Sequence, residues 1–145
     1  MNSYGQIALP LGRHGQIIRN FLLDAEVEQV QRLLEARGGG EFIGQTVPNM
    51  PGIDGWLDGV PTSLKRLNST NPLRLFDFAR KAWRKLAETE YRGARVHIDA
   101  RMLTVQQVIN FVTGEKASPT WGRILSSQTV THLSILTSDG LVNFY

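Results

Sequence analysis

The chemistry in this sequence centres on a short segment that contains an acid, a hydroxyl and an amine. Asp54 and Lys65 flank an Asp58-Gly59 pair, and Asp-Gly is a preferred two-residue turn of a β-hairpin. With that turn, Asp54 lies opposite Ser63, and Lys65 projects from the same face as Ser63. A carboxylate holds a hard cation such as magnesium, and a lysine orients or deprotonates an attacking group. The spacing therefore indicates phosphodiester chemistry, although a turn aspartate beside a solvated lysine produces the same pattern.

Two further residues of this segment have alternative interpretations. Asp58 has the strand parity of Asp54 and would reach a metal there, but the preference for Asp-Gly in hairpin turns favours a turn residue. Trp56 is a candidate for stacking on a base, whereas tryptophans in strands are more often part of the core. We therefore treat Asp58 as a turn residue and keep Trp56 as a candidate substrate-binding residue.

The three histidines are scattered, and none has metal-ligand spacing with another: His14, His97 and His132. Strand parity puts His97 and Asp99 on one face, where they either reach a cleft or face solvent. We predict solvent exposure or a structural role for this pair, so a histidine-based mechanism has no support in the sequence.

The elements that must position these residues follow from apolar periodicity and from Gly, Pro and Asn signals. We expect, in order, a helix over 24–37, strands over 41–47, 53–57 and 61–67, a helix over 72–91, a strand over 94–100, a helix over 104–112, and strands over 129–137 and 141–145. Residues 1–20 form an irregular arm, and 21–145 form the domain. This order predicts a three-layer α/β/α fold with a mixed sheet, an extra C-terminal helix and a C-terminal β-hairpin.

The helix expected over 72–91 has a basic side and an apolar side. The basic residues are Arg74, Lys81, Arg84 and Lys85, and the apolar residues opposite them are Phe76, Ala79, Trp83 and Leu86. Such a stripe suits binding along a phosphate backbone, and an ordinary solvated helix face explains it equally well.

Composition sets outer limits on the function. The chain has 145 residues, 16 Lys plus Arg against 13 Asp plus Glu, and a formal charge of +3, which is compatible with a phosphate-bearing partner. It has no cysteine, so it contains neither a disulfide nor a cysteine-based zinc site. No stretch is long and apolar enough for a bilayer crossing, so we expect no stable membrane insertion of the domain, and the N-terminus lacks a secretory signal.

A long segment around the candidate residues resembles a known family. The run V-P-N-M-P-G-I-D-G-W-L-D-G-V-P-T-S-L-K, residues 47–65, is similar to the core motif of the C-terminal toxin domains of contact-dependent growth inhibition proteins and related polymorphic toxins, a PD-(D/E)XK-like group. The resemblance extends from about Asp24 to the Asp139-Gly140 turn, more weakly outside the motif, and leaves the first 20 residues uncovered.

The resemblance implies a PD-(D/E)XK nuclease core, in the order helix-strand-strand-strand-helix-strand, and a nuclease that requires Mg²⁺ or Mn²⁺. It further implies hydrolysis of RNA, above all transfer RNA, and a cognate immunity protein, which we expect to be acidic. It also implies export as the C-terminal part of a larger cell-surface protein and action in the cytoplasm of the target cell. A DNase of the same fold and a non-catalytic binding domain are the alternatives.

The family pattern also assigns roles to residues. It places the metal-binding acid at Asp54, the catalytic lysine at Lys65 and the second acid of the motif at Ser63, where this chain departs from the pattern. Because a hydroxyl is a poorer cation ligand than a carboxylate, a further acid is needed. Glu26, Glu28 and Glu35 of the first helix are available, and a helical wheel puts Glu26 beside the apolar face. We therefore expect Glu26 to share the metal with Asp54.

Overall fold

A computed structural model of the chain describes residues 8–10, 15–48, 51–114 and 118–144. Its helices and strands are, in chain order, β1 (Ala8–Pro10), β2 (Gln16–Ile18), α1 (Asp24–Arg37), β3 (Glu41–Gly44), β4 (Gly55–Leu57), β5 (Val60–Arg66), α2 (Arg74–Ala87), β6 (Ala94–Asp99), α3 (Val105–Val112), α4 (Ser118–Ser126), β7 (Val130–Leu136) and β8 (Leu141–Asn143). Several parts of the sequence-based interpretation fall outside the described residues: residues 1–7 and 11–14 of the expected arm, with His14 among them, the Asn49-Met50 part of the motif, and the last residue of the strand expected over 141–145.

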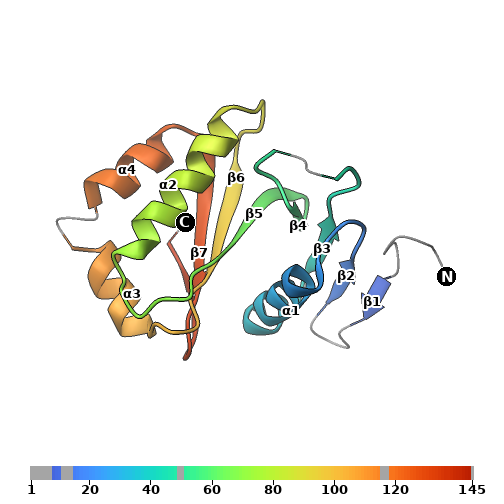
Figure 1. The fold of residues 1–145 in the computed structure, drawn as a ribbon, viewed down its shortest axis with the longest axis horizontal. Helices are drawn as coiled ribbons and strands as arrows, with labels where there is room; N and C mark the ends of the chain where they lie inside the picture. Colours follow the sequence, from blue (N-terminus) through green and yellow to red (C-terminus); the bar gives the residue numbers. More distant parts are fainter. Residues whose placement is uncertain (1–7, 11–14, 49–50, 115–117, 145) are drawn as a thin grey trace.

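The described strands form one mixed sheet of eight strands, in which neighbours in space are neighbours in sequence. Three neighbouring pairs are parallel, namely β2 with β3, β5 with β6 and β6 with β7, and the other pairs are antiparallel. A parallel pair needs a crossover connection, and helices supply all three: α1, then α2, then α3 together with α4. The expected mixed α/β fold with a C-terminal hairpin of β7 and β8 is therefore confirmed (Figure 1).

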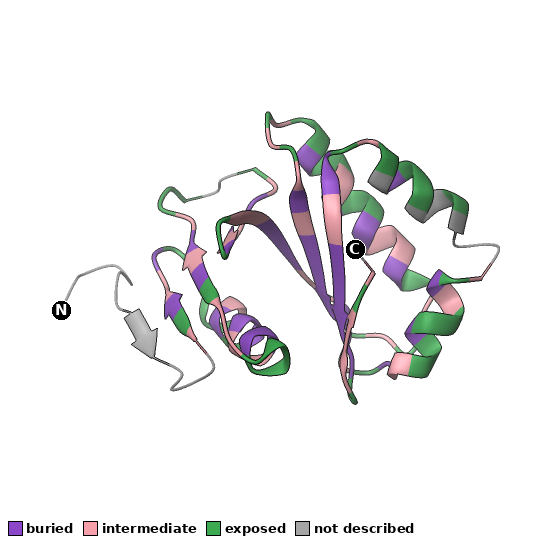
Figure 2. Cartoon of the chain, turned by 180° about the vertical axis from the view of Figure 1, so that it is seen from behind, coloured by how far each residue is buried: buried purple, intermediate pink, exposed green. Residues whose placement is uncertain are grey.

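Helices cover both faces of the sheet. Helices α2, α3 and α4 lie on one side of the central strands, and α1 lies on the other (Figure 1). The side chains of β5 point to the two faces of the sheet in turn. Leu64 therefore packs in the core under α1, and Leu67, just beyond the strand, packs in the core under α2. The central strands β6 and β7 and the middle of β5 are mostly buried (Figure 2), which is expected of strands that are covered on both sides.

The helix α1 begins and ends at residues that satisfy its terminal backbone groups. The N-cap is Leu23, one residue before the expected Asp24, and its N–H donates to Oε1 of Glu26 at 2.9 Å. At the other end, Gly38 adopts the left-handed conformation with φ 81°, which a glycine takes at little cost. Glu26 is therefore fixed in the first turn.

None of the described helices combines the length and the apolar character that crossing a membrane requires.

The sequence-based prediction differs from the structure in two regions. The irregular arm expected over 1–20 contains β1 and β2, and Ile17 of β2 is fully buried in the core under α1. Strands of three residues are too short to show a clear alternation in sequence. The helix α4 was not expected, because Pro119 and Gly122 interrupt its sequence, although proline is well tolerated in a first helical turn.

Candidate active site

Asp54 immediately precedes β4, at the open end of the hairpin that β4 forms with β5. The hairpin register pairs Gly55 with Thr62, and the Asp54 N–H donates to the Thr62 carbonyl at 2.9 Å, so the predicted register is confirmed. The Leu64 N–H has no β4 residue opposite it and donates instead to Oδ2 of Asp54 at 2.7 Å. Ser63 is buried between these positions. The structure therefore places Asp54 opposite Ser63, as the Asp-Gly turn predicted.

The residue after Asp54 has to be small. A Cβ atom on Gly55 would come within 2.4 Å of the Phe42 ring of β3 and within 2.5 Å of the Ile43 carbonyl oxygen. Glycine therefore lets β3 and β4 approach closely directly beside the acid, and this explains the Asp-Gly pair at 54–55 in physical terms.

Lys65 lies near Asp54 and near two lysines of α2. Burial lowers the pKa of Lys65, the charge of Asp54 opposes that change, and the charges of Lys85 and Lys81 lower the pKa further. The main chain of Lys65 is held from the other face, because Nε2 of Gln29 in α1 donates to its carbonyl at 2.8 Å. A half-buried lysine with a lowered pKa is suited to accept a proton or to hold developing negative charge.

Glu26 completes the group from the first turn of α1. Burial raises the pKa of Asp54 to about 6; the Leu64 N–H and the charge of Lys65 oppose that rise, and the nearby carboxyl group of Glu26 contributes to it. Glu26 and Asp54 are therefore neighbours in the structure, although 28 positions separate them in sequence. The role of Glu26 as a metal ligand stays a prediction.

The other acids of α1 have different surroundings. Glu28 contacts Arg101 at 3.1 Å and Arg66 at 3.4 Å. The hydrogen bond with Arg101 is the main cause that lowers the pKa of Glu28, and the charges of Arg101 and Arg66 add to it. Glu35 is exposed and lies beside Arg32 on the rim of a shallow surface hollow. Glu26 is therefore the α1 glutamate that has Asp54 as a neighbour.

The pair Glu26 and Asp54 has the donor chemistry of a site for a hard divalent cation. Two carboxyls in contact repel each other when both are ionised, and a cation between them would relieve that repulsion. Within the described ranges, no group of three or more His, Asp or Glu residues comes together. A cation here would accordingly have two carboxylates from the protein and the remaining ligands from neutral oxygens such as water, which suits Mg²⁺.

Asp58 takes the turn alternative, and Trp56 is only partly buried. Asp58 and Gly59 both have positive φ, at 48° and 83°, as a two-residue hairpin turn requires. The Asp58 carboxylate accepts the Glu41 N–H at 2.8 Å and contacts Arg37 at 3.1 Å, so it serves the turn. Trp56 is partly buried against the core under α2, and its stacking on a base stays a prediction.

The basic stripe on α2 is exposed along its full length. The buried residues of this helix are Leu75, Ala79, Ala82 and Leu86, and the exposed basic residues are Arg74, Arg80, Lys81, Arg84 and Lys85. Asp77 partly neutralises the first turn, since it contacts Arg80 at 2.9 Å and Arg74 at 3.8 Å. Lys81 and Lys85 act on the pKa of Lys65, so this part of the stripe borders the candidate site.

The expected solvent exposure of His97 and Asp99 is wrong, because both residues are fully buried under α1. Nδ1 of His97 hydrogen-bonds with the Ser134 hydroxyl at 2.8 Å, and burial lowers its pKa to about 3. Burial opposes ionisation of Asp99, but hydrogen bonds from Arg101 and Arg32 outweigh it and lower the pKa. The structural role, the other alternative from sequence, accounts for Asp99.

Sequence reasoning missed Gln29, which holds the main chain of Lys65, and a pair of arginines between α2 and α4. Gln29 was hidden among the polar residues of α1, although its spacing of three from Glu26 puts both on adjacent turns of the helix. Arg80 and Arg123 are brought together by the packing of α2 against α4, which sequence periodicity does not reveal.

Comparisons of the chain with protein-family models, with curated proteins and with solved structures gave no match.

Proposed function

We propose that the chain is a metal-dependent nuclease that hydrolyses phosphodiester bonds in RNA, above all transfer RNA. The observation that carries the proposal is that Glu26 and Asp54 lie close enough to affect each other's charge, beside a half-buried Lys65 whose pKa is lowered. The order α1, β3, β4, β5, α2, β6 also agrees with the core order of the PD-(D/E)XK group that the segment 47–65 resembles. The choice of RNA follows from that resemblance.

In this proposal Glu26 and Asp54 hold a divalent cation. When bound, such a cation would supply Lewis-acid activation of the scissile phosphate and of a water nucleophile. Lys65 accepts a proton from the attacking water or holds the charge that develops on the phosphoryl oxygens, and its lowered pKa favours the first role. Ser63, buried opposite Asp54, helps to position water or phosphate.

The basic stripe on α2 supplies the substrate contacts. Lys81 and Lys85 border the site, Arg84 lies beside them on the exposed side of the helix, and Arg74 extends the stripe towards its N-terminus. Each Lys or Arg that neutralises a phosphate releases a counterion, so binding should weaken steeply as salt is added. Trp56 is assigned to stacking on a base at the edge of the site.

The biological setting is part of the proposal. A cell that makes an active nuclease has to block it, so we propose a cognate immunity protein, and a net charge of +3 favours an acidic one. We further propose that the domain is exported as the C-terminal part of a larger cell-surface protein and acts in the cytoplasm of the target cell. Co-expression of the domain with its immunity protein should restore growth that the domain alone stops.

The direct test is cleavage of total transfer RNA and of plasmid DNA, side by side, with Mg²⁺ and with EDTA. Asp54→Ala and Lys65→Ala should each reduce the cleavage rate by about 10² to 10⁴-fold. Glu26→Gln and Glu35→Gln form a matched pair on the same helix, and only the first should lose activity. Cleavage that persists in EDTA and in both the Asp54 and Lys65 variants would exclude the proposed site. Cleavage of the plasmid alone would identify a DNase.

A further inference from the structure

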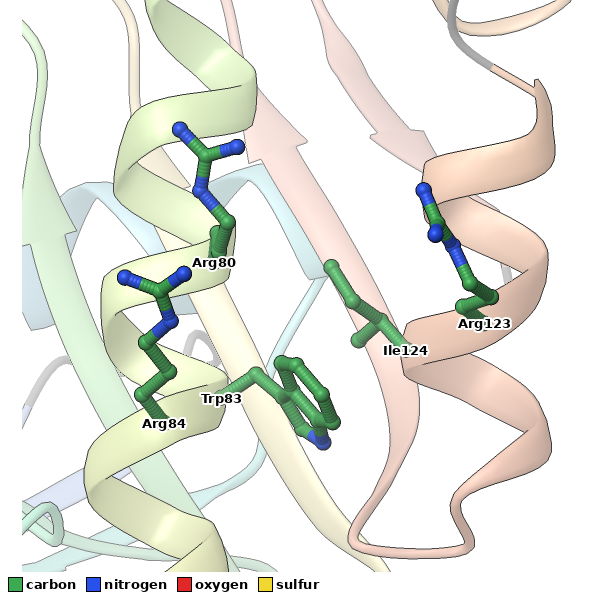
Figure 3. A pocket seen from close by; sticks show the side chains of 5 residues that line it. All are labelled: Arg80, Trp83, Arg84, Arg123 and Ile124. Atoms are coloured by element: carbon green, nitrogen blue, oxygen red, sulfur yellow. The ribbon is translucent and has the colours of Figure 1, made fainter.

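A small pocket lies between α2 and α4, beside the basic stripe. It is lined by Arg80, Trp83 and Arg84 of α2 and by Arg123 and Ile124 of α4, and its volume is about 280 Å³ (Figure 3). Trp83 and Ile124 face each other across the gap between the two helices, and the three arginines lie around them (Figure 3). The pocket therefore combines an aromatic and aliphatic floor with a cationic rim.

Two of the three arginines keep their charge free for a ligand. Arg80 contacts Asp77 at 2.9 Å, so its charge is partly neutralised. The described residues include no carboxylate within ion-pair distance of Arg84 or of Arg123, and both side chains are exposed. A guanidinium presents a planar fork of donors that matches the oxygens of a phosphate. Two such groups on facing helices favour an anionic ligand that bridges them.

The floor of the pocket is held in a fixed arrangement. The indole N–H of Trp83 donates to the Ser127 hydroxyl at 3.0 Å, which orients the ring, and Ile124 is 3% exposed. The Ser127 hydroxyl in turn donates to the Ile124 carbonyl at 2.5 Å. An oriented indole on a partly exposed helix face offers a surface on which a flat base can stack.

We propose that this pocket is a nucleotide subsite, in which one base stacks on Trp83 while the flanking phosphates contact Arg84 and Arg123. The inference rests on the proposed nuclease function and extends it to a second contact with the same strand. A volume near 280 Å³ is at the lower limit of ligand pockets, so it fits one base and not a longer run.

The pocket is continuous with the candidate active site around α2. Successive residues of a helix are about 100° apart, so Arg84 lies about 60° from Lys81 around the axis, and Arg80 lies about 40° further. The cationic surface therefore runs from Lys85 and Lys81, which border Lys65, to the rim of the pocket. A strand with its scissile phosphate at Lys65 would cross α2 before a later base enters the pocket.

Binding measured without cleavage tests the subsite. Fluorescence anisotropy in EDTA, with a fluorescein-labelled single-stranded RNA of about 12 nucleotides, gives affinity for the parent and for Arg84→Gln, Arg123→Gln and Trp83→Leu. We expect each variant to bind about 5- to 20-fold more weakly, and each arginine variant to lower the salt dependence by about 0.7 per lost phosphate contact. The matched control is Arg92→Gln, an exposed arginine outside the pocket, which should stay within about twofold of the parent.

A second measurement needs no variant. RNA that contains 5-bromouridine is bound to the parent protein and irradiated, and the crosslinked peptides are identified by mass spectrometry. We expect crosslinks in peptides that include Trp83 or α4. Thermal unfolding of each variant, compared with the parent, separates loss of a contact from loss of the fold.

The outcomes separate the subsite from the nuclease function. Variants that bind like the Arg92 control, with no crosslink in α2 or α4, would overturn the subsite even if the parent cleaves RNA. Fluorescein-labelled polyglutamate, measured in the same anisotropy assay, tests for an acidic protein ligand. If the variants lose polyglutamate binding as much as RNA binding, the subsite is overturned in favour of such a ligand. If the parent binds RNA through the pocket but cleaves nothing with Mg²⁺, the subsite stands and the nuclease proposal fails.

Discussion

The carboxyl group of Asp54, just before β4, is a neighbour of the carboxyl group of Glu26 in the first turn of α1, and the charge of Glu26 helps to raise the pKa of Asp54. Two neighbouring carboxylates repel each other, so a proton on one of them or a bound cation would relieve the repulsion. This relationship makes the stability of the metal-free protein informative about the site.

Asp54→Asn should stabilise the metal-free protein above pH 7 and abolish cleavage. The folded-state pKa of Asp54 is about 6, above its unfolded value of about 3.9, so its contribution to stability is fully present below pH 4 and is lost as the pH rises through 6. Above pH 7 the ionised carboxylate therefore lowers the free energy of unfolding by about 3 kcal/mol, and an uncharged amide avoids this loss. Urea unfolding in EDTA at pH 5 and pH 8 measures the difference.

The control for this prediction is Asp77→Asn, which changes an exposed carboxylate of α2. It should leave the pH dependence of unfolding close to that of the parent. An Asp54→Asn variant that is less stable than the parent at pH 8 would show that the carboxylate has a structural role there.

Lys81→Gln and Lys85→Gln should each raise the pKa of Lys65, because the positive charges of the two α2 lysines help to lower it. NMR titration of the lysine side chains, in which the Lys65 signal is assigned with Lys65→Arg, follows this pKa without any substrate. Arg92→Gln removes a charge outside the site and should leave the titration unchanged. A Lys65 pKa that does not respond to removal of both α2 lysines would exclude the proposed electrostatic link between α2 and the site.

The hairpin that carries Asp54 was predictable because its signals are local. Asp58-Gly59 defines a two-residue turn with positive φ at both positions, and the turn alone sets the register that brings Asp54 opposite Ser63. Glu26 was found by a helical wheel for the same reason, since helical geometry fixes which side chains lie beside the apolar face of α1.

The surroundings of β6 were not predictable from the pattern of that strand. Alternation separates His97 and Asp99 from Val96 and Ile98, but it does not show that a helix covers each face. Both faces of a central strand in a mixed sheet are buried, so polar residues on β6 meet α1 and not solvent. The pocket at Trp83 depends in the same way on the tertiary packing of α4.

His97→Asn should remove much of the sensitivity of the protein to acid. The folded-state pKa of His97 is about 3, below its unfolded value of about 6.5, so its stabilising contribution is complete above pH 6.5 and is lost as the pH falls towards 3. The full loss corresponds to about 5 kcal/mol. Asparagine places a polar group near the position of Nδ1 and so keeps a partner for the Ser134 hydroxyl.

Unfolding free energies at pH 4 and pH 7 measure this effect, and His132→Asn is the matched control. His132 is only partly buried and hydrogen-bonds with the neighbouring Thr131 hydroxyl at 2.9 Å, so its replacement should change the acid sensitivity less. Equal acid sensitivity of the parent and His97→Asn would place the acid-labile group elsewhere.

Asp99→Asn should destabilise the protein by about 3 kcal/mol, because it removes the buried anion that binds Arg32 of α1 and Arg101. Both carboxylate oxygens of Asp99 accept from Arg32 at 2.7 Å, and Oδ2 also contacts Arg101 at 2.8 Å. Glu28→Gln is the control, since Glu28 contacts Arg101 from the exposed side and should matter much less. Urea denaturation at pH 7 with unchanged m-values tests the ranking, and a larger loss from Glu28→Gln than from Asp99→Asn would mean that the exposed contact holds Arg101 in place.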